Sequence, residues 1–211
     1  EICACLVGSE MCIRDSCYKI PDGKGPCVNV QSELTAYNFA GDYTAWFYNG
    51  ENHNIGPEKL TETDGTRLPV MTVKAGDKHY MAIHEACLET GAPLVLQSKG
   101  GESLFSVASK PTSLSPGYTS AWRVVLYGTT PGVLTDSHLL ELLNPDPDSR
   151  YDFSWVKPGL AVWDWRINGA VWDGFTYGMS YPSWVRMVDF AAEQGFKYLV
   201  LDANWLSLIH I

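Results

Sequence analysis

The sequence predicts a mostly β protein, in which an N-terminal β-sandwich is followed by the first one or two units of a truncated (β/α)8 barrel. Three observations support this prediction. Short β-like runs, separated by turn-rich strings, extend from Cys27 to about Tyr127. The pattern becomes helical after Gly132. Beyond Trp155 it changes to strand, helix, strand, with apolar runs of the kind that parallel sheets bury.

Residues 17–130 form the predicted sandwich, which is partial. Turn-rich strings such as Lys74-Ala-Gly-Asp77 separate its strands at the spacing of antiparallel sheets. The expected strands are Cys27–Tyr37, Thr44–Tyr48, Leu68–Val73, His79–Ala86, Pro93–Gln97, Ser103–Ala108 and Ala121–Tyr127.

Residues 131–154 form a predicted linker, with a short helix over Val133–Leu143 that ends at Asn144-Pro-Asp-Pro-Asp148. Residues 155–205 then begin the predicted barrel. Leu160–Trp163 and Lys197–Leu201 are expected to be buried parallel strands. Between them, Pro182–Gln194 has helical period, with Ser183 as the expected N-cap and Gly195 as the left-handed stop. A complete barrel needs about 250 residues, so at most about two of its eight units are expected here, as in an interrupted gene product.

The two ends of the chain resemble translated library adapter DNA. Residues 1–16 include Cys5-Leu-Val-Gly-Ser-Glu-Met-Cys-Ile-Arg-Asp-Ser16, and residues 206–211 read Leu-Ser-Leu-Ile-His-Ile. We expect both strings to be foreign and exclude them from the fold prediction. The cysteines beyond the first string, Cys17, Cys27 and Cys87, have no metal-type spacing.

Composition excludes some classes of partner. The 211 residues carry a net charge of -9, which argues against binding to nucleic acid or to an anionic membrane surface. No apolar run approaches the roughly 20 residues of a membrane span. Aromatic residues make up 12% of the chain, which favours either a β-rich core or a surface that stacks on sugar rings.

Carboxylates and tryptophans follow the two expected barrel strands. Asp164 and Trp165 follow the first, and Asp202 and Trp205 follow the second. Side chains beyond the carboxyl ends of barrel strands line active sites. A carboxylate accepts hydrogen bonds from sugar hydroxyls, and an indole covers the apolar ring face. These four residues are therefore predicted to bind substrate, although core packing remains an alternative for Trp165.

A second candidate lies in the strand over His79–Ala86, where His84 and Glu85 fall on opposite faces. Glu85 is either a charge at the sheet edge or an oxygen ligand for a hard cation such as Ca²⁺. The residues alone leave both interpretations open.

Several strings together resemble glycoside hydrolase family 97, the bacterial α-glucosidases and α-galactosidases. The strings that carry the resemblance are Ile83-His-Glu-Ala86, Ala121-Trp-Arg-Val-Val125, Asp152-Phe-Ser-Trp-Val-Lys-Pro-Gly159, Ala161-Val-Trp-Asp-Trp165, Asp189-Phe-Ala-Ala-Glu193 and Tyr198-Leu-Val-Leu-Asp-Ala-Asn-Trp205. The interval from Ala86 to Trp122 is shorter than the family's, so a loop or strand of the sandwich is expected to be absent.

The resemblance implies a calcium-dependent parent enzyme that hydrolyses α-glucosidic or α-galactosidic bonds of oligosaccharides. It implies that Glu85 is a Ca²⁺ ligand, and it gives His84 no role. The family's acid and base lie on later barrel strands, so no catalytic residue is expected in this chain and the fragment is expected to be inactive. Inversion and retention stay open, since both catalytic carboxylates are needed to tell them apart. The resemblance also implies a periplasmic or cell-surface location.

A rival hypothesis is a non-catalytic carbohydrate-binding β-sandwich module. The strand, helix, strand segment after Trp155 argues against it, because a binding module has no use for such an appendage. A purely structural or interaction domain would explain neither Asp164 nor Asp202.

Overall fold

The structure is a computed structural model of the chain, and it describes residues 2–5, 13–48, 50, 54–89 and 91–202. The chain divides into two compact units, Glu1–Pro147 and Asp148–Ile211, and each is described by itself. Within the described residues, no helix is both long and apolar enough to cross a membrane.

The first unit is mostly β. Its strands are β1 (Ile2–Cys5), β2 (Ile13–Tyr18), β3 (Val28–Val30), β4 (Ala36–Asn38), β5 (Thr44–Tyr48), β6 (Asn54–Lys59), β7 (Asp64–Lys74), β8 (Tyr80–Ala86), β9 (Leu96–Lys99), β10 (Leu104–Val107), β11 (Thr112–Leu114) and β12 (Trp122–Gly128). Its helices are α1 (Pro131–Thr135) and α2 (Leu139–Leu142), and a 3-10 turn covers Leu60–Glu62.

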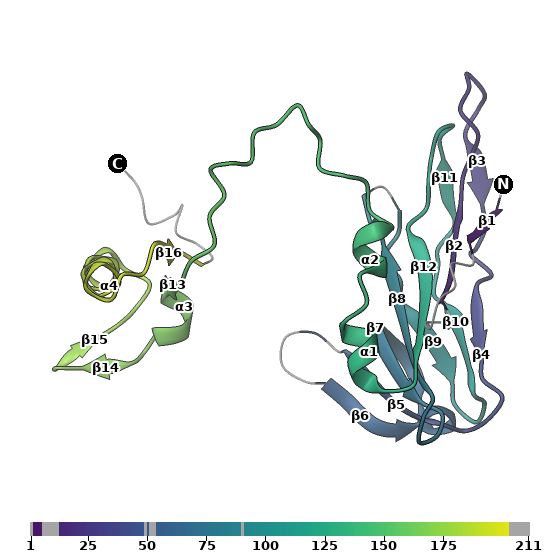
Figure 1. Cartoon of the computed structure of the whole chain (residues 1–211), viewed down its shortest axis with the longest axis horizontal. Helices are drawn as coiled ribbons and strands as arrows, with labels where there is room; N and C mark the ends of the chain where they lie inside the picture. The colour runs from purple at the N-terminus through teal and green to yellow at the C-terminus, as the bar shows by residue number, and fades with distance from the viewer. Residues whose placement is uncertain (1, 6–12, 49, 51–53, 90, 203–211) are drawn as a thin grey trace. The chain divides into compact units, whose positions relative to one another are not determined.

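Most of these strands form one curled antiparallel sheet (Figure 1). Its order is β1-β2-β12-β8-β7-β9-β10-β4, with β5 paired to β7 and β6 paired to β5. Strand β7 is the longest and belongs to both halves. Its residues 64–67 pair with β9, and its residues 71–74 pair with β8. Strands β3 and β11 form a separate two-stranded ribbon.

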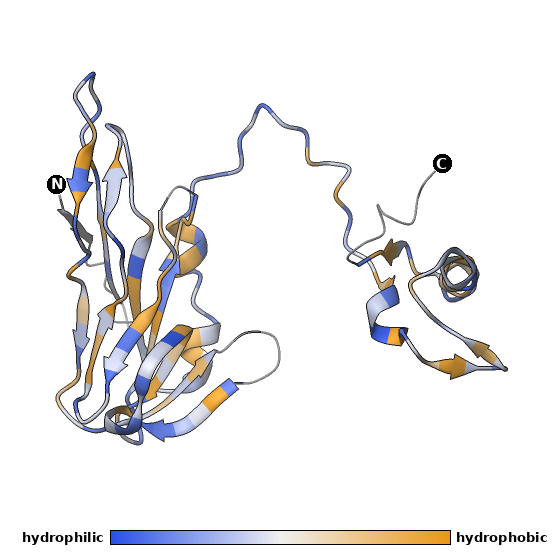
Figure 2. Cartoon of the chain, turned by 180° about the vertical axis from the view of Figure 1, so that it is seen from behind, coloured by the Kyte–Doolittle hydropathy of each residue, from blue (hydrophilic) through white to orange (hydrophobic). Residues whose placement is uncertain are grey.

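The main core lies between the two halves of the curled sheet. Along β9 and β10 buried and exposed residues alternate, so that one face of each of these strands is buried. Figure 2 shows hydrophobic and hydrophilic residues interspersed in the strands of the sheet. This core buries Phe47 of β5 and Met71 of β7 together with Leu96 of β9 and Phe105 of β10. Side chains from both halves of the sheet thus meet in one cluster.

Helices α1 and α2 pack on the other face of β8 and β12 (Figure 1). Ala82 and Ala86 of β8, with Val124 and Leu126 of β12, are buried there beside Leu139 of α2. Strand β8 is therefore covered on both faces. The residues on its inner face, including Ile83 and Glu85, belong to the side of the main core.

The second unit contains one strand, helix, strand connection. Its elements are β13 (Ala161–Trp163), α3 (Asp164–Ile167), β14 (Val171–Trp172), β15 (Phe175–Thr176), α4 (Tyr181–Gln194) and β16 (Tyr198–Val200). Strands β13 and β16 are parallel and in register from Ala161 opposite Tyr198 to Trp163 opposite Val200. Because parallel strands share one direction, the residues after Trp163 and after Val200 lie at the same edge.

The C-terminus of α4 agrees with the sequence prediction. Gly195 adopts φ 72°, and its N–H donates to Ala192 O while the N–H of Phe196 donates to Ala191 O. This is a Schellman ending, in which the ring of Phe196 lies 5.9 Å from that of Phe190. The predicted cap at the other end was wrong, because the N-cap is Ser180. Ser183 lies inside α4, and its Oγ accepts the N–H of Gly178.

Three other predictions are corrected. The expected helix Val133–Leu143 is divided into α1 and α2, and the expected strand Cys27–Tyr37 is divided into β3 and β4. The expected sandwich is one continuous hydrogen-bonded sheet, because β7 is long enough to belong to both halves. The one parallel pair β13–β16 does not by itself establish a barrel, so the barrel remains a prediction.

The adapter origin of the ends also remains a prediction. Residues 13–16 belong to β2, which pairs with β12. Residues 206–211 lie outside the described residues.

Candidate functional site

The first group of candidate residues surrounds Glu85, whose side chain is 12% exposed. Glu85 lies on β8 directly opposite Arg123 of β12, so both side chains are on the inner face of the sheet. Arg123 is 6% exposed and also reaches Glu33, which lies in the loop between β3 and β4. We call Glu33, Glu85 and Arg123 the glutamate–arginine cluster.

The guanidinium of Arg123 binds its two glutamates unequally. Nε donates to Oε1 of Glu33 over 2.9 Å and Nη2 donates to Oε2 over 2.8 Å, which is a two-pronged ion pair. Nη1 donates to Oε2 of Glu85 over 3.2 Å, and Nη2 also reaches Ala92 O at 3.3 Å. All three nitrogens of the guanidinium thus donate to protein groups.

The pairing of Glu33 with Arg123 favours the charged form of both residues. Burial by itself raises the pKa of Glu33, but the hydrogen bonds and charge of Arg123 outweigh it, so this pKa lies below the ordinary value. Burial opposes the charge on Arg123, yet Glu33 and Glu85 raise its pKa above the ordinary value. Glu33 and Arg123 are therefore both ionised at neutral pH.

One oxygen of Glu85 is held by the protein. Its Oε2 accepts the N–H of Leu94 over 2.6 Å in addition to Arg123. Its Oε1 accepts no hydrogen bond from the described residues. His84 faces the other way, and its Nδ1 lies 2.7 Å from the backbone nitrogen of Glu85. Among the described residues, no three His, Cys, Asp or Glu side chains gather as a cation site.

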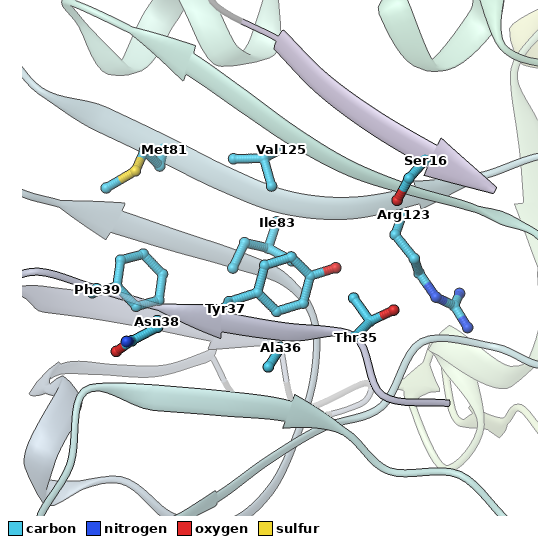
Figure 3. Close-up of a pocket in the computed structure, with 10 residues that line it drawn as sticks. All are labelled: Ser16, Thr35, Ala36, Tyr37, Asn38, Phe39, Met81, Ile83, Arg123 and Val125. Carbon is cyan, nitrogen blue, oxygen red and sulfur yellow. The ribbon is translucent and has the colours of Figure 1, made fainter. Parts of the chain in front are cut away.

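A hollow of about 490 Å³ lies beside Arg123 on the inner side of the sheet (Figure 3). One side of the hollow is formed by β4 and the residues next to it, with Thr35, Tyr37 and Phe39 in its lining. The opposite side includes Met81 of β8 and Val125 of β12. Both polar groups and apolar side chains therefore line this hollow.

The hydroxyl oxygen of Tyr37 is buried and has no hydrogen-bond partner among the described residues. Burial raises the pKa of Tyr37 to about 12, so the phenol stays protonated at neutral pH.

The second group lies at the carboxyl edge of β13 and β16. Asp164 is 1% exposed, and both of its oxygens accept hydrogen bonds from the protein. Oδ2 accepts the indole N–H of Trp184 of α4 over 2.9 Å. Oδ1 accepts the backbone N–H of Asp202 over 3.0 Å, which joins the ends of the two strands.

Asp202 is more accessible than Asp164. Its Oδ2 accepts the indole N–H of Trp163 over 2.8 Å, so both its backbone and its carboxylate are fixed. Trp163 is 36% exposed, and the guanidinium carbon of Arg166 lies over its ring, 5.0 Å from the ring centroid. The structure thus brings the two predicted aspartates together at one edge.

The predicted tryptophans have different positions. Trp165 lies in α3 with 53% of its surface exposed, and its predicted role in substrate binding stays a prediction. Trp205 lies outside the described residues.

Sequence reasoning missed several residues of these two groups. Arg123 and Glu33 were not predicted, and neither were the indole donors Trp163 and Trp184. It also missed the hairpin β14–β15, whose signal was available. The turn Asp173-Gly174 has φ of 50° and 67°, and Asp-Gly between apolar residues is typical of a two-residue hairpin turn.

The chain is similar in sequence to two curated proteins. A curated relative from Bacteroides thetaiotaomicron, described as a retaining alpha-galactosidase, is 28% identical over 193 residues. The alignment covers 78% of this chain and 29% of the relative. The chain also spans 29% of the length of a relative from Streptomyces bingchenggensis, described as a probable retaining alpha-galactosidase, again at 28% identity over 208 residues and 89% of this chain.

Solved structures show the same fold. A glycoside hydrolase family 97 enzyme from Pseudoalteromonas sp. strain K8, in complex with acarbose, has a TM-score of 0.68 at 22% identity. The match covers 92% of this chain and 33% of that one. A variant of this enzyme in complex with panose matches with the same TM-score of 0.68, 22% identity and coverage of 92% and 33%.

The family model described as glycosyl-hydrolase 97 N-terminal matches residues 17–145, which is more than half of the chain. The chain therefore belongs to glycoside hydrolase family 97.

Proposed function

We propose that this chain is part of a glycoside hydrolase that cleaves α-glycosidic bonds of oligosaccharides. The family match over residues 17–145 is the observation that carries the proposal. It is supported by the second unit, where a carboxylate and exposed indoles lie at the carboxyl edge of two parallel strands. We assign residues 155–205 to the start of a (β/α)8 barrel on the same ground.

The proposed roles at this edge differ between the two aspartates. Asp202 and Trp165, with Trp205, would contact the sugar, since Asp202 keeps accessible surface and Trp165 is exposed. Asp164 was predicted to bind substrate as well. With both oxygens occupied by Trp184 and Asp202, it is better suited to hold Asp202 in place.

The proposed substrates include both α-galactosides and α-glucosides. The curated relative from Bacteroides thetaiotaomicron is described as a retaining alpha-galactosidase, which favours α-galactosides and retention. The solved Pseudoalteromonas enzymes are in complex with acarbose and, for a variant, with panose, which favours α-glucosides.

Calcium is part of the proposal, with Glu85 as one ligand. Oε1 of Glu85, which accepts no hydrogen bond from the described residues, is an oxygen of the kind that a hard cation binds, while Oε2 is held by Arg123 and the N–H of Leu94. When bound, Ca²⁺ would supply positive charge that stabilises negative charge developing in the reaction. The described residues provide one such ligand and no complete site.

The test is to recover the longer reading frame from the source DNA and to express its product. We expect that product to hydrolyse an aryl α-galactoside or an aryl α-glucoside in a Ca²⁺-dependent reaction. The purified 211-residue chain should be inactive on both. Turnover by the 211-residue chain itself, or a recovered frame without further strand and helix units, would contradict the proposal.

The second candidate is a carbohydrate-binding β module. The hollow beside Arg123, lined by tyrosine, phenylalanine, hydroxyl and amide side chains, favours it. Deletion of residues 148–211 separates the two candidates. Sugar binding that survives the deletion unchanged would favour the module, and binding that disappears would favour the hydrolase.

We also propose a periplasmic or cell-surface location for the parent protein, on the ground of family membership alone. Fractionation of cells that express the recovered frame, followed by immunodetection, is the measurement that tests it.

A further inference from the structure

The second unit contains a hollow of about 640 Å³, which is a size typical of small-molecule sites. Residues of β13, α3, β14 and α4 line it. Its wall is mostly apolar, and it includes Trp172 of β14 with Met187 and Phe190 of α4. The two aspartates of the carboxyl edge do not belong to its lining. The hollow is therefore a separate candidate site in this unit.

Two arginines carry the charge of this lining. Arg166 of α3 and Arg186 of α4 both line the hollow, and the rest of the described lining has no Asp, Glu or Lys. Each guanidinium lies over an aromatic ring, that of Arg166 over Trp163 and that of Arg186 over Phe175, at 5.0 and 4.1 Å from the ring centroids. Within the part of the chain that the structure describes, neither guanidinium has an ion-pair or hydrogen-bond partner.

These two guanidiniums differ from those of two other arginines of the chain. The guanidinium of Arg123 donates to two glutamates and a carbonyl, and that of Arg150 donates to Asp148. A guanidinium that stacks on a ring keeps the N–H groups in its own plane for a carboxylate or a phosphate. Arg166 and Arg186 thus keep the donors that bind an anion.

The polar side-chain groups of the lining are mostly donors. Guanidinium and indole N–H groups only donate, and the hydroxyl of Tyr177 is the only side-chain oxygen in the described lining. The hydroxyls of a sugar need acceptors as well as donors, so this lining suits a sugar poorly. An anion needs donors, and the apolar wall is best covered by an apolar group. The lining therefore fits a molecule that has both features.

We propose that this hollow binds a small amphiphilic anion, in which a carboxylate is attached to an aromatic or other apolar body. The N–H groups of Arg166 and Arg186 bind the carboxylate, and Trp172 and Phe190 contact the body. The chain has a net charge of -9, so its overall charge does not attract anions and binding depends on these two arginines. The inference does not rest on the proposed function, and its failure leaves that function untouched.

The test is an amide NMR titration of the 211-residue chain with 2-naphthoate, in which a naphthalene ring carries one carboxylate. We expect 2-naphthoate to shift the signals of Trp172, Met187 and Phe190 until they saturate. The signal of Trp155 should stay in place, because this residue is also exposed but does not line the hollow. The uncharged analogue 2-naphthamide has the same ring, and it should bind about ten-fold more weakly.

Two variants assign the binding to the arginines. R166Q and R186Q each remove one guanidinium, so each should raise the Kd for 2-naphthoate about five-fold and leave the Kd for 2-naphthamide unchanged. The control variant is R150Q, since Arg150 belongs to the same unit but does not line the hollow. It should leave both Kd values unchanged. Unchanged amide signals outside the hollow show that each variant is folded.

The inference is wrong if 2-naphthoate shifts none of the signals of the hollow. It is also wrong if 2-naphthamide binds as tightly, or if R166Q and R186Q have no effect, because the hollow is then only an apolar surface. A shift of Trp155 together with the signals of the hollow would show general adhesion to exposed apolar residues instead of a site. If the signals of the hollow shift with protein concentration before any probe is added, a second copy of the chain occupies it in place of the anion.

Discussion

At the scale of single residues, the carboxylate of Asp164 connects three parts of the second unit. It follows β13, accepts the indole N–H of Trp184 from α4, and accepts the backbone N–H of Asp202 next to β16. Trp184 is buried and Asp202 is partly buried, so these donors have little access to water if the carboxylate is lost. Asp164, which the sequence predicts as a sugar ligand, thus holds β13, α4 and the end of β16 together through its hydrogen bonds.

Asp164→Asn is expected to destabilise the second unit by about 2–3 kcal/mol. The amide can accept one of the two hydrogen bonds, but its NH₂ group would face the other donor and leave it unsatisfied. Urea unfolding followed by tryptophan fluorescence measures the change. The control is Asp173→Asn, at a turn position with φ 50° that asparagine also tolerates, where we expect almost no effect. Equal stability of the two variants would refute this role of Asp164.

The ion pair of Glu33 makes stability depend on pH. Because its pKa is lowered in the folded chain, its contribution is complete above the ordinary glutamate pKa and is lost as the pH falls through the lowered value. We expect Glu33→Gln to cost about 2 kcal/mol at about pH 7 and less below about pH 4. Denaturant midpoints measured between about pH 3 and pH 7 check this, and a cost that is constant with pH would contradict it.

The cluster was beyond reach of sequence reasoning. Arg123 lies within a strand that the pattern predicts. Its position opposite Glu85 of β8, however, depends on a register that is set by the whole sheet. Glu33 lies in a loop 90 residues away in sequence. Asp164 and Asp202, by contrast, could be placed at one edge, because each follows an apolar run and parallel strands share their direction.

At the scale of elements, local signals predicted strands and helices well where one pattern dominated. Strand β5 has the predicted bounds, and α4 ends at the predicted glycine. The pattern failed where a break is set by tertiary contacts. The apolar residues of Val133–Leu143 suit one helix, but Leu134 of α1 and Leu139 of α2 both pack on the sheet, and the chain bends between them.

Gly195→Ala should destabilise α4 by about 1 kcal/mol, because a side chain at φ 72° is strained and the two hydrogen bonds that end the helix need this conformation. Thermal unfolding of the variant is the measurement. Gly178→Ala is the matched control, since Gly178 has open space at its Cβ position and an ordinary φ. The same loss in both variants would show that the conformation of Gly195 is not the cause.

At the scale of the whole molecule, the second unit exposes many large apolar side chains. Trp155, Trp165 and Trp172 are 76%, 53% and 74% exposed, and α4 adds Val188 and Phe190 at 50% each. Monomeric proteins seldom leave so much apolar surface uncovered, and the chain spans 29% of the length of its curated relatives. Other protein or a ligand is therefore expected to cover this surface.

Removal of residues 148–211 should increase solubility and reduce binding of the dye ANS. The two buried clusters of the first unit consist only of residues before Pro147, so the sheet is expected to stay folded. Far-ultraviolet circular dichroism, solubility limits and ANS fluorescence of the long and short chains make the comparison. Loss of the β spectrum in the short chain would show that the first unit depends on the second.

Strand β7 has a consequence for the dynamics of the first unit. Because its residues 64–67 bond to β9 and its residues 71–74 to β8, neither half of the sheet can open without releasing β7 from part of its partners. The two halves should thus behave as one cooperative opening unit, or foldon, rather than as two. In hydrogen exchange, the amides of β8 and of β9 should then converge on one opening free energy as denaturant is added.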